Sequence, residues 1–88
     1  MSETQELLQF PCDFPIKIMG ENSDAFEKAA LDIISEKAPE TDIKNVSVRL
    51  SSKGNYRAIS VVIKAQSREA LDALYLALTS HPLVRVVL

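Results

Sequence analysis

The sequence predicts an α+β domain whose elements run in the order strand, helix, strand, strand, helix, strand. Three segments alternate apolar and polar residues with the period of two that is typical of strands, and a fourth is rich in β-branched residues. Two further segments repeat apolar residues at helical spacing. Between the two middle strands lies a short turn that contains Gly54, which predicts a hairpin.

The first strand is expected to follow an N-terminal leader, residues 1–13, and to open a single domain that spans residues 14–88. Leu7, Leu8 and Phe10 of the leader could dock on that domain. In residues 14–19 every second side chain is apolar, which indicates a strand that Gly20 ends. Pro15 is compatible with this strand because it stands near the expected start.

The first helix is expected to begin at one of three good N-capping residues, 22–24, and to continue with apolar residues at helical spacing until Pro39 stops it. Residues 46–51 and 58–65 alternate as the two hairpin strands. Ser67 caps the second helix, which residues 79–82 break, and residues 83–88 form the last strand.

Two right-handed crossovers joined by a hairpin produce a four-stranded antiparallel sheet with both helices on one face. This arrangement is the ferredoxin-like fold, which ACT domains, acylphosphatases and RNA-recognition motifs also build. The fold by itself does not establish an activity, because unrelated functions share it.

Composition excludes several classes of protein. The chain has 88 residues, of which 47% are hydrophobic and 25% charged, so it fits one domain with a modest core. Cys12 is the sole cysteine, which excludes an internal disulfide and an all-cysteine metal site. The acidic N-terminus and the lack of a long apolar run predict neither a signal peptide nor a membrane helix, and therefore a cytoplasmic protein.

Charge is divided unevenly along the chain. Residues 1–42 hold ten acidic and three basic residues, a net charge of −7, whereas residues 43–88 hold two acidic and seven basic residues, a net charge of +5. This division indicates either a basic surface that meets an anion or two halves that neutralise each other within the fold.

The open face of the predicted sheet carries the candidate binding site. On the last strand we expect Val84, Val86 and Leu88 to point inward, and Leu83, Arg85 and Val87 to point outward. The outward positions would then place four bases on one face, with no acid on the same strand parities and apolar residues among them. The candidate ligand-binding residues are Lys17, Arg49, Lys64, Arg85, Met19 and Val62. The alternative is an ordinary solvated sheet face.

Catalytic, metal and cofactor chemistry are not predicted. The two glycines form no phosphate-binding loop, and His81, the sole histidine, has no carboxylate near it in sequence. The turn motif consists of Ser51, Ser52, Lys53, Gly54, Asn55 and Tyr56; it serves either as a structural turn in which Gly54 takes positive φ or as a set of donors to an anion. Base stacking has little support, since Tyr56 is the single aromatic residue on the open face.

Three segments of the chain match the motifs of one family. Residues 10–11 and 14–20 (FP and FPIKIMG) resemble its opening motif, residues 51–60 (SSKGNYRAIS) its central motif, and residues 84–88 (VRVVL) its last strand. This is the YbeD-like group of small bacterial proteins, and the resemblance covers nearly the whole chain. It implies a ferredoxin-like, ACT-like fold and a lipoic acid-binding regulatory role, without an active site that could be carried over.

These observations predict a non-enzymatic cytoplasmic binding or regulatory module for a small anionic ligand such as lipoate, a carboxylate with an apolar body. One alternative is a protein-interaction module that acts as a homodimer without a small ligand. The other is a weak RNA binder, which the sequence pI of about 5.3 makes less favourable.

Overall fold

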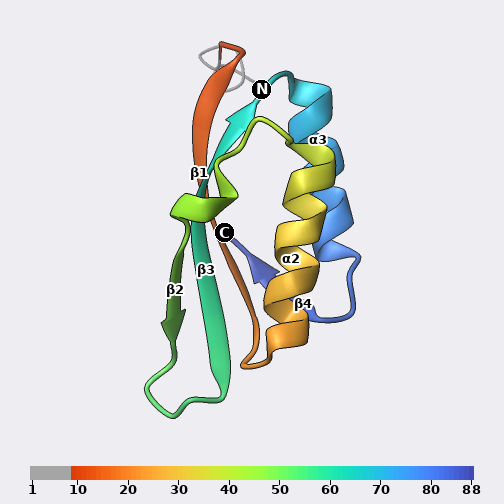
Figure 1. Cartoon of the computed structure of the whole chain (residues 1–88). Coiled ribbons are helices and arrows are strands. Elements are labelled where there is room, and N and C mark those ends of the chain that lie inside the picture. The colour runs from red at the N-terminus through yellow and green to blue at the C-terminus, as the bar shows by residue number, and fades with distance from the viewer. Residues whose placement is uncertain (1–8) are drawn as a thin grey trace.

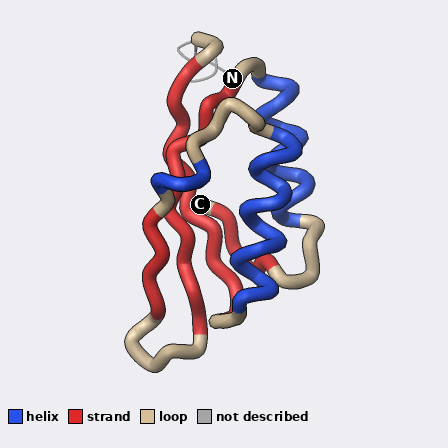
Figure 2. Tube along the Cα trace, in the orientation of Figure 1, coloured by secondary structure: helices blue, strands red, loops and turns tan. Residues whose placement is uncertain are grey.

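The computed structural model describes residues 9–88 and has the predicted architecture (Figures 1 and 2). A four-stranded antiparallel sheet in the order β2-β3-β1-β4 carries both helices on one face, so the predicted ferredoxin-like fold is confirmed. The elements are β1 (Cys12–Glu21), α2 (Asp24–Lys37), the 3-10 turn η1 (Ile43–Asn45), β2 (Ser47–Leu50), β3 (Tyr56–Ala65), α3 (Arg68–Thr79) and β4 (Val84–Val87).

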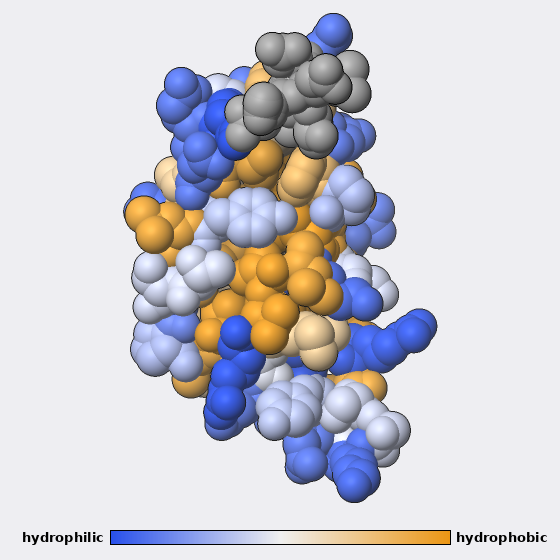
Figure 3. Space-filling model, turned by 180° about the vertical axis from the view of Figure 1, so that it is seen from behind, coloured by the Kyte–Doolittle hydropathy of each residue, from blue (hydrophilic) through white to orange (hydrophobic). Residues whose placement is uncertain are grey.

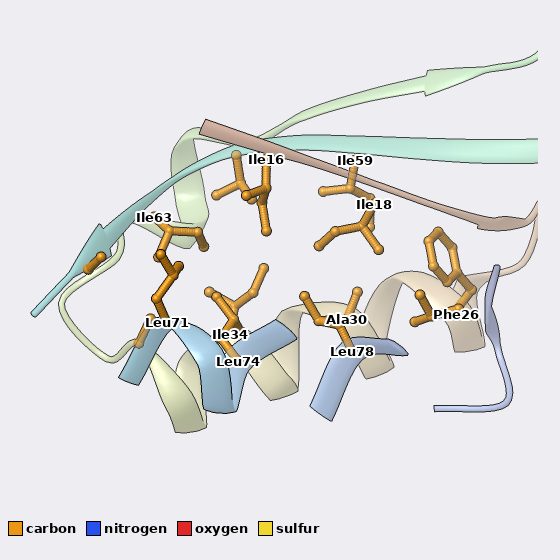
Figure 4. Close-up of a cluster of buried hydrophobic side chains, with 14 residues drawn as sticks. Ile16, Ile18, Phe26, Ala30, Ile34, Ile59, Ile63, Leu71, Leu74 and Leu78 are labelled. Carbon is orange, nitrogen blue, oxygen red and sulfur yellow. The ribbon is translucent and has the colours of Figure 1, made fainter. Parts of the chain in front are cut away.

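The core lies between the sheet and the two helices (Figure 4). From α2 it receives Phe26, Ala30 and Ile34, and α3 adds leucines at the predicted helical spacing. These side chains meet the alternate apolar residues of β1 and β3. The buried residues from α3 and the strands are Leu71, Leu74, Leu78, Ile16, Ile18, Ile59, Val61, Ile63, Ala65 and Val84.

Serine caps both helices. The Ser23 hydroxyl accepts a hydrogen bond from the Phe26 N–H at 3.1 Å, and the Ser67 hydroxyl accepts one from the Ala70 N–H at 3.0 Å. Each bond satisfies one of the amide groups that the first helical turn leaves without a partner. Of the three capping residues offered by the sequence, Ser23 is therefore the one that is used.

β1 is longer than the sequence pattern indicates. It begins at Cys12, inside the segment expected to be a leader, and runs through Gly20 to Glu21. Leu7 and Leu8 lie outside the described residues, whereas Phe10 packs half-buried against the core.

Pro15 is the fourth residue of β1, so its place at the strand start is not what makes it acceptable. The amide of Lys17 donates to Leu88, which means that it faces the β4 side of β1. Backbone groups of alternate residues face the same side, so the nitrogen of Pro15 also faces that side. β4 does not extend that far, and the proline therefore removes no ladder hydrogen bond.

Gly20 does not end β1. Its lack of a side chain lets the Phe26 ring and the Leu83 carbonyl group lie close to the β1 backbone. A Cβ atom at this position would stand 2.5 Å from the Leu83 carbonyl oxygen and 2.5 Å from the nearest Phe26 ring carbon. The other glycine, Gly54, has a φ of 74°, which confirms the predicted positive-φ turn.

The register of β4 differs from the prediction. Met19 pairs with Val86 and Gly20 pairs with Val84, so Arg85 is an extra residue that forms a bulge. The bulge reverses the side-chain alternation after Val84. Val86 and Leu88, which were expected to point inward, are therefore exposed; Leu83 and Val87, which were expected to point outward, are half-buried against the core.

Candidate functional site

The open face of the sheet consists of side chains aligned in rows across the strands. Lys17 of β1 lies opposite Ser60 of β3, and Ser60 lies opposite Ser47 of β2. On its other side Lys17 exchanges two backbone hydrogen bonds with Leu88, at 3.1 and 2.8 Å. Because directly paired residues share a face, these four side chains form one row.

The next row has the same design. Met19 lies opposite Ala58, Ala58 lies opposite Arg49, and Val86 completes the row on β4. In both rows the β3 residue is small, Ser60 or Ala58, and the β1 residue beside it is long, Lys17 or Met19. On β2 the first row has another small residue, Ser47, and the second row has Arg49. The middle of the open face is therefore a shallow trough with a base on either side of it, Lys17 on β1 and Arg49 on β2.

Two adjoining hollows with largely apolar walls occupy this trough, beside a more polar one that both Lys17 and Arg49 line. The larger has a volume of about 470 Å³, and its lining includes Pro15, Val62, Leu88, Lys17 and Ser60. The smaller has a volume of about 240 Å³, and its lining includes Met19, Tyr56, Arg49 and Ala58. Lys17 lines both hollows and Leu88 does as well. The trough therefore combines apolar walls with two exposed cationic groups.

The four predicted bases are not equivalent, and the expectation of a face without acids is wrong. Lys64 pairs with Asp13 at 2.7 Å, and Arg85 pairs with Glu21 at 2.8 Å. Both acids stand on β1 with the same parity as Lys17, at the two ends by which the strand exceeds its predicted length. The hydrogen bond and the negative charge of Asp13 raise the pKa of the Lys64 ammonium group.

Lys17 and Arg49 differ from the other two bases. Within residues 9–88 neither forms an ion pair with an acidic side chain, and both side chains are exposed. The structure also brings Met19 and Val62, the two apolar members of the predicted site, into the lining of the two hollows beside them. The paired bases Lys64 and Arg85 line neither hollow.

Ser51, the first residue of the turn motif, has a structural role. The Ser51 hydroxyl accepts a hydrogen bond from the Tyr56 N–H at 3.1 Å, and the Ser51 carbonyl accepts one from the Gly54 N–H at 2.9 Å. Asn22, in the loop before α2, donates its side-chain amide to the Gly54 carbonyl at 2.9 Å. The turn is thereby joined to the start of α2.

Arg57 has a role that the sequence patterns do not predict. Its guanidinium group donates to Asn22 Oδ1 at 2.8 and 3.0 Å, to Glu27 at 2.7 Å and to Asp24 at 3.2 Å. Its side chain is 16% exposed, so these bonds are partly shielded from water. Arg57 is a base at a strand position whose side chain should face the helices, and two acids stand at the start of the preceding helix. This combination is the sequence signal that could have revealed the role of Arg57.

The remaining reactive side chains, His81 and Cys12, lie in places where they contribute to the structure. His81 Nδ1 accepts a hydrogen bond from the Leu83 N–H at 3.1 Å, which shapes the loop between α3 and β4. Cys12 packs half-buried at the margin of the core. In residues 9–88 no three potential metal ligands lie together, and no helix has the length and apolar character needed to span a membrane.

The fold and the open face define a small ferredoxin-like domain with an exposed sheet surface. More particularly, the chain belongs to the family described as "Protein of unknown function (DUF493)", whose model matches residues 5–88. This confirms the resemblance to a family of small bacterial proteins.

Relatives in other bacteria support this assignment. The UPF0250 protein NMC1112 of Neisseria meningitidis is 49% identical over 82 residues, which are 93% of this chain and 90% of that protein. A UPF0250 protein of Paraburkholderia phytofirmans is 46% identical over 87 residues, 99% of this chain and 98% of that protein. The uncharacterised protein TM1266 of Thermotoga maritima is similar in structure, with a TM-score of 0.65, 14% sequence identity and coverage of 86% of this chain and 92% of that one. This last similarity concerns the fold alone.

Proposed function

We propose that this protein is a cytoplasmic, non-enzymatic binding module that holds a small carboxylate with an apolar body on the open face of its sheet. The observation that carries the proposal is the pair of exposed bases, Lys17 and Arg49, which have no acidic partner within residues 9–88. They stand on opposite sides of β3, next to two hollows with largely apolar walls.

The proposed ligand lies along the trough. Its carboxylate sits over Ser60 and Ala58, between the two bases, where it gains attraction from both positive charges. Its apolar body enters the larger hollow and covers Pro15, Val62 and Leu88. Val62 is 50% exposed and Leu88 is 67% exposed, so a ligand there removes apolar surface from water. Lipoate, which the family resemblance suggests, has both parts.

The two alternatives fit this surface less well. A homodimer formed face to face through the open sheet would bring two copies each of Lys17 and Arg49 together, and like charges repel when solvent is excluded. An RNA-binding face would need several stacking aromatic residues, whereas Tyr56 is the one aromatic side chain among the residues that line the trough.

Calorimetric titration of the purified protein tests the proposal with three probes: lipoate, octanoate and lipoamide, which lacks the carboxylate. Lys17→Gln and Arg49→Gln should each weaken lipoate binding about 2- to 5-fold, because each removes one exposed charge contact. The double variant should lose about 4- to 25-fold, the product of the two single losses. Raising the ionic strength should weaken binding of lipoate but not of lipoamide.

Lys64→Gln and Arg85→Gln are the matched controls, since their charges are already satisfied by Asp13 and Glu21. Both should bind lipoate within about twofold of the parent. If all four variants lost the same lipoate affinity, the loss would result from the change in net charge and not from the removal of a base beside the trough. Equal affinity for lipoate and lipoamide would refute the role of the carboxylate.

A further inference from the structure

The outer edge of β4 is the apolar side of the molecule. β4 lies on the far side of the molecule in Figure 1, and seen from behind the middle of the molecule is occupied by apolar side chains between hydrophilic ends (Figure 3). Val86 is 43% exposed and Leu88 67% exposed, and Leu83 and Val87 are half-buried beside them. We call these four residues the β4 edge surface. We propose that a second copy of this chain docks on the β4 edge surface, with the two β4 strands paired antiparallel about Val87.

The backbone of β4 leaves one set of hydrogen-bonding groups free for such a partner. Leu88 directs its N–H and C=O toward Lys17 of β1. Backbone groups of successive strand residues face opposite sides, so those of Val87 face away from the sheet. β4 is the last strand in the sheet order, and no strand within residues 9–88 covers this edge.

The bulge determines the register of the proposed pairing. Because Arg85 is the extra residue, the regular part of the edge runs from Val86 to Leu88, and its centre is Val87. A two-fold axis at Val87 pairs the two Val87 backbones with each other. The same axis places Val86 of each copy opposite Leu88 of the other copy. The two most exposed side chains of the β4 edge surface therefore cover each other.

Charge favours a copy of the same surface as the occupant. Arg85, the one charged residue of β4, is already paired with Glu21 at 2.8 Å, and on α3 Arg68 is paired with Asp72 at 3.3 Å. The side chains of the β4 edge surface therefore carry no free charge that would attract a charged partner or repel a second copy. The opposite edge differs, because β2 carries Arg49, which has no acidic partner within residues 9–88.

The proposed dimer has one eight-stranded sheet, with the open faces of both copies on the same side. A two-fold axis through an antiparallel strand pair stands perpendicular to the sheet, so both troughs stay accessible. Leu88 lies at the seam and also lines the hollows of the trough. The dimer is compatible with the proposed ligand site but does not depend on it.

Two valines allow a matched test. Val86 on β4 is 43% exposed and Val48 on β2 is 42% exposed, so Val86→Lys and Val48→Lys place the same charge at equally exposed positions on opposite sheet edges. Sedimentation velocity should show the parent chain associating with a Kd between about 1 μM and 1 mM, the range of a small interface. Val86→Lys should weaken association about tenfold or more, and Val48→Lys should leave it within about twofold. Thermal melting by circular dichroism verifies that both variants fold.

A parent chain that stays monomeric through about 1 mM would overturn the proposal. Association that is lost in Val48→Lys but kept in Val86→Lys would overturn it as well, since β2 would then be the docking edge.

Disulfide trapping tests the register independently of any charged variant. In a Cys12→Ser background, chains with Val86→Cys are mixed with chains with Leu88→Cys and oxidised gently. The two positions face each other in a non-hydrogen-bonded cross-strand pair, where Cα atoms lie about 4.5 Å apart and a disulfide can close. The mixed dimer should therefore form at least about tenfold faster than with Val48→Cys in place of Val86→Cys. Equal rates for the two mixtures would refute the β4 pairing.

Discussion

Replacing Gly20 by alanine should destabilise the domain by adding one methyl group at a place without room for it. The new Cβ would stand 2.5 Å from the Leu83 carbonyl oxygen and 2.5 and 2.6 Å from two ring carbons of Phe26. Non-bonded carbon contacts are comfortable at about 3.5–4.0 Å, so the neighbours must move by about 1 Å. The Phe26 ring is fully buried and the Leu83 oxygen belongs to the backbone, so neither can turn aside freely.

The expected cost follows from two opposing effects. Overpacking of a tight site costs about 1–3 kcal/mol, and contacts on both sides place Gly20→Ala near the upper end of that range. Alanine recovers about 0.5–1 kcal/mol, because it loses less conformational freedom on folding than glycine does. The net loss should be about 2 kcal/mol, which lowers the melting temperature of a domain of this size by about 8–16 °C.

Urea unfolding followed by circular dichroism measures this loss, and the other glycine is its control. Gly54 has a φ of 74°, and no atom lies within 4 Å of the place that a Cβ would take, so Gly54→Ala should cost about 1 kcal/mol through backbone strain alone. A Phe26→Leu background should reduce the cost of Gly20→Ala by at least about 0.5 kcal/mol, because it removes part of the ring contact. If Gly20→Ala unfolds within about 0.5 kcal/mol of the parent, the packing argument is wrong.

Further predictions concern the core, the hairpin anchor, the α3–β4 loop and alkaline pH. Leu74→Ala should cost about 2–5 kcal/mol in urea unfolding, since Leu74 is 1% exposed in the middle of the core; a cost below about 1 kcal/mol would contradict that placement. Arg57→Met keeps the packed stem but removes bonds to three partners, and should cost about 1–3 kcal/mol by the same assay. His81→Asn should retain stability because its side-chain oxygen can accept the Leu83 N–H, whereas His81→Leu should lose about 1 kcal/mol; similar losses for both would remove the role of this hydrogen bond. Burial raises the pKa of the Tyr75 phenol above its ordinary value of 10.0, so the unfolded chain loses this proton first and stability should fall as pH rises through 10 and above. Tyr75→Phe should flatten that decline in melting curves recorded against pH.

The candidate site was predictable in its position but not in its charge balance. Strand alternation places Lys17 and Arg49 on the open face, and the register confirms that they flank β3. Alternation could not reveal that Asp13 and Glu21 extend β1 at both ends, since an acid between two nearby prolines, or an acid next to a glycine, does not resemble part of a strand. Their presence divides four predicted bases into two paired ones and two exposed ones.

Local sequence was sufficient to predict the order of the elements, the Ser67 cap and the positive φ of Gly54. Each of these depends on residues a few positions apart, where side-chain period and backbone preference act locally. The bulge at Arg85, the close approach at Gly20 and the anchoring of Arg57 to α2 emerge only when the chain is folded. In these cases segments distant in the sequence must share one space, and the free energy depends on which atoms meet there. For that reason the inward and outward residues of β4 could not be read from its own alternation.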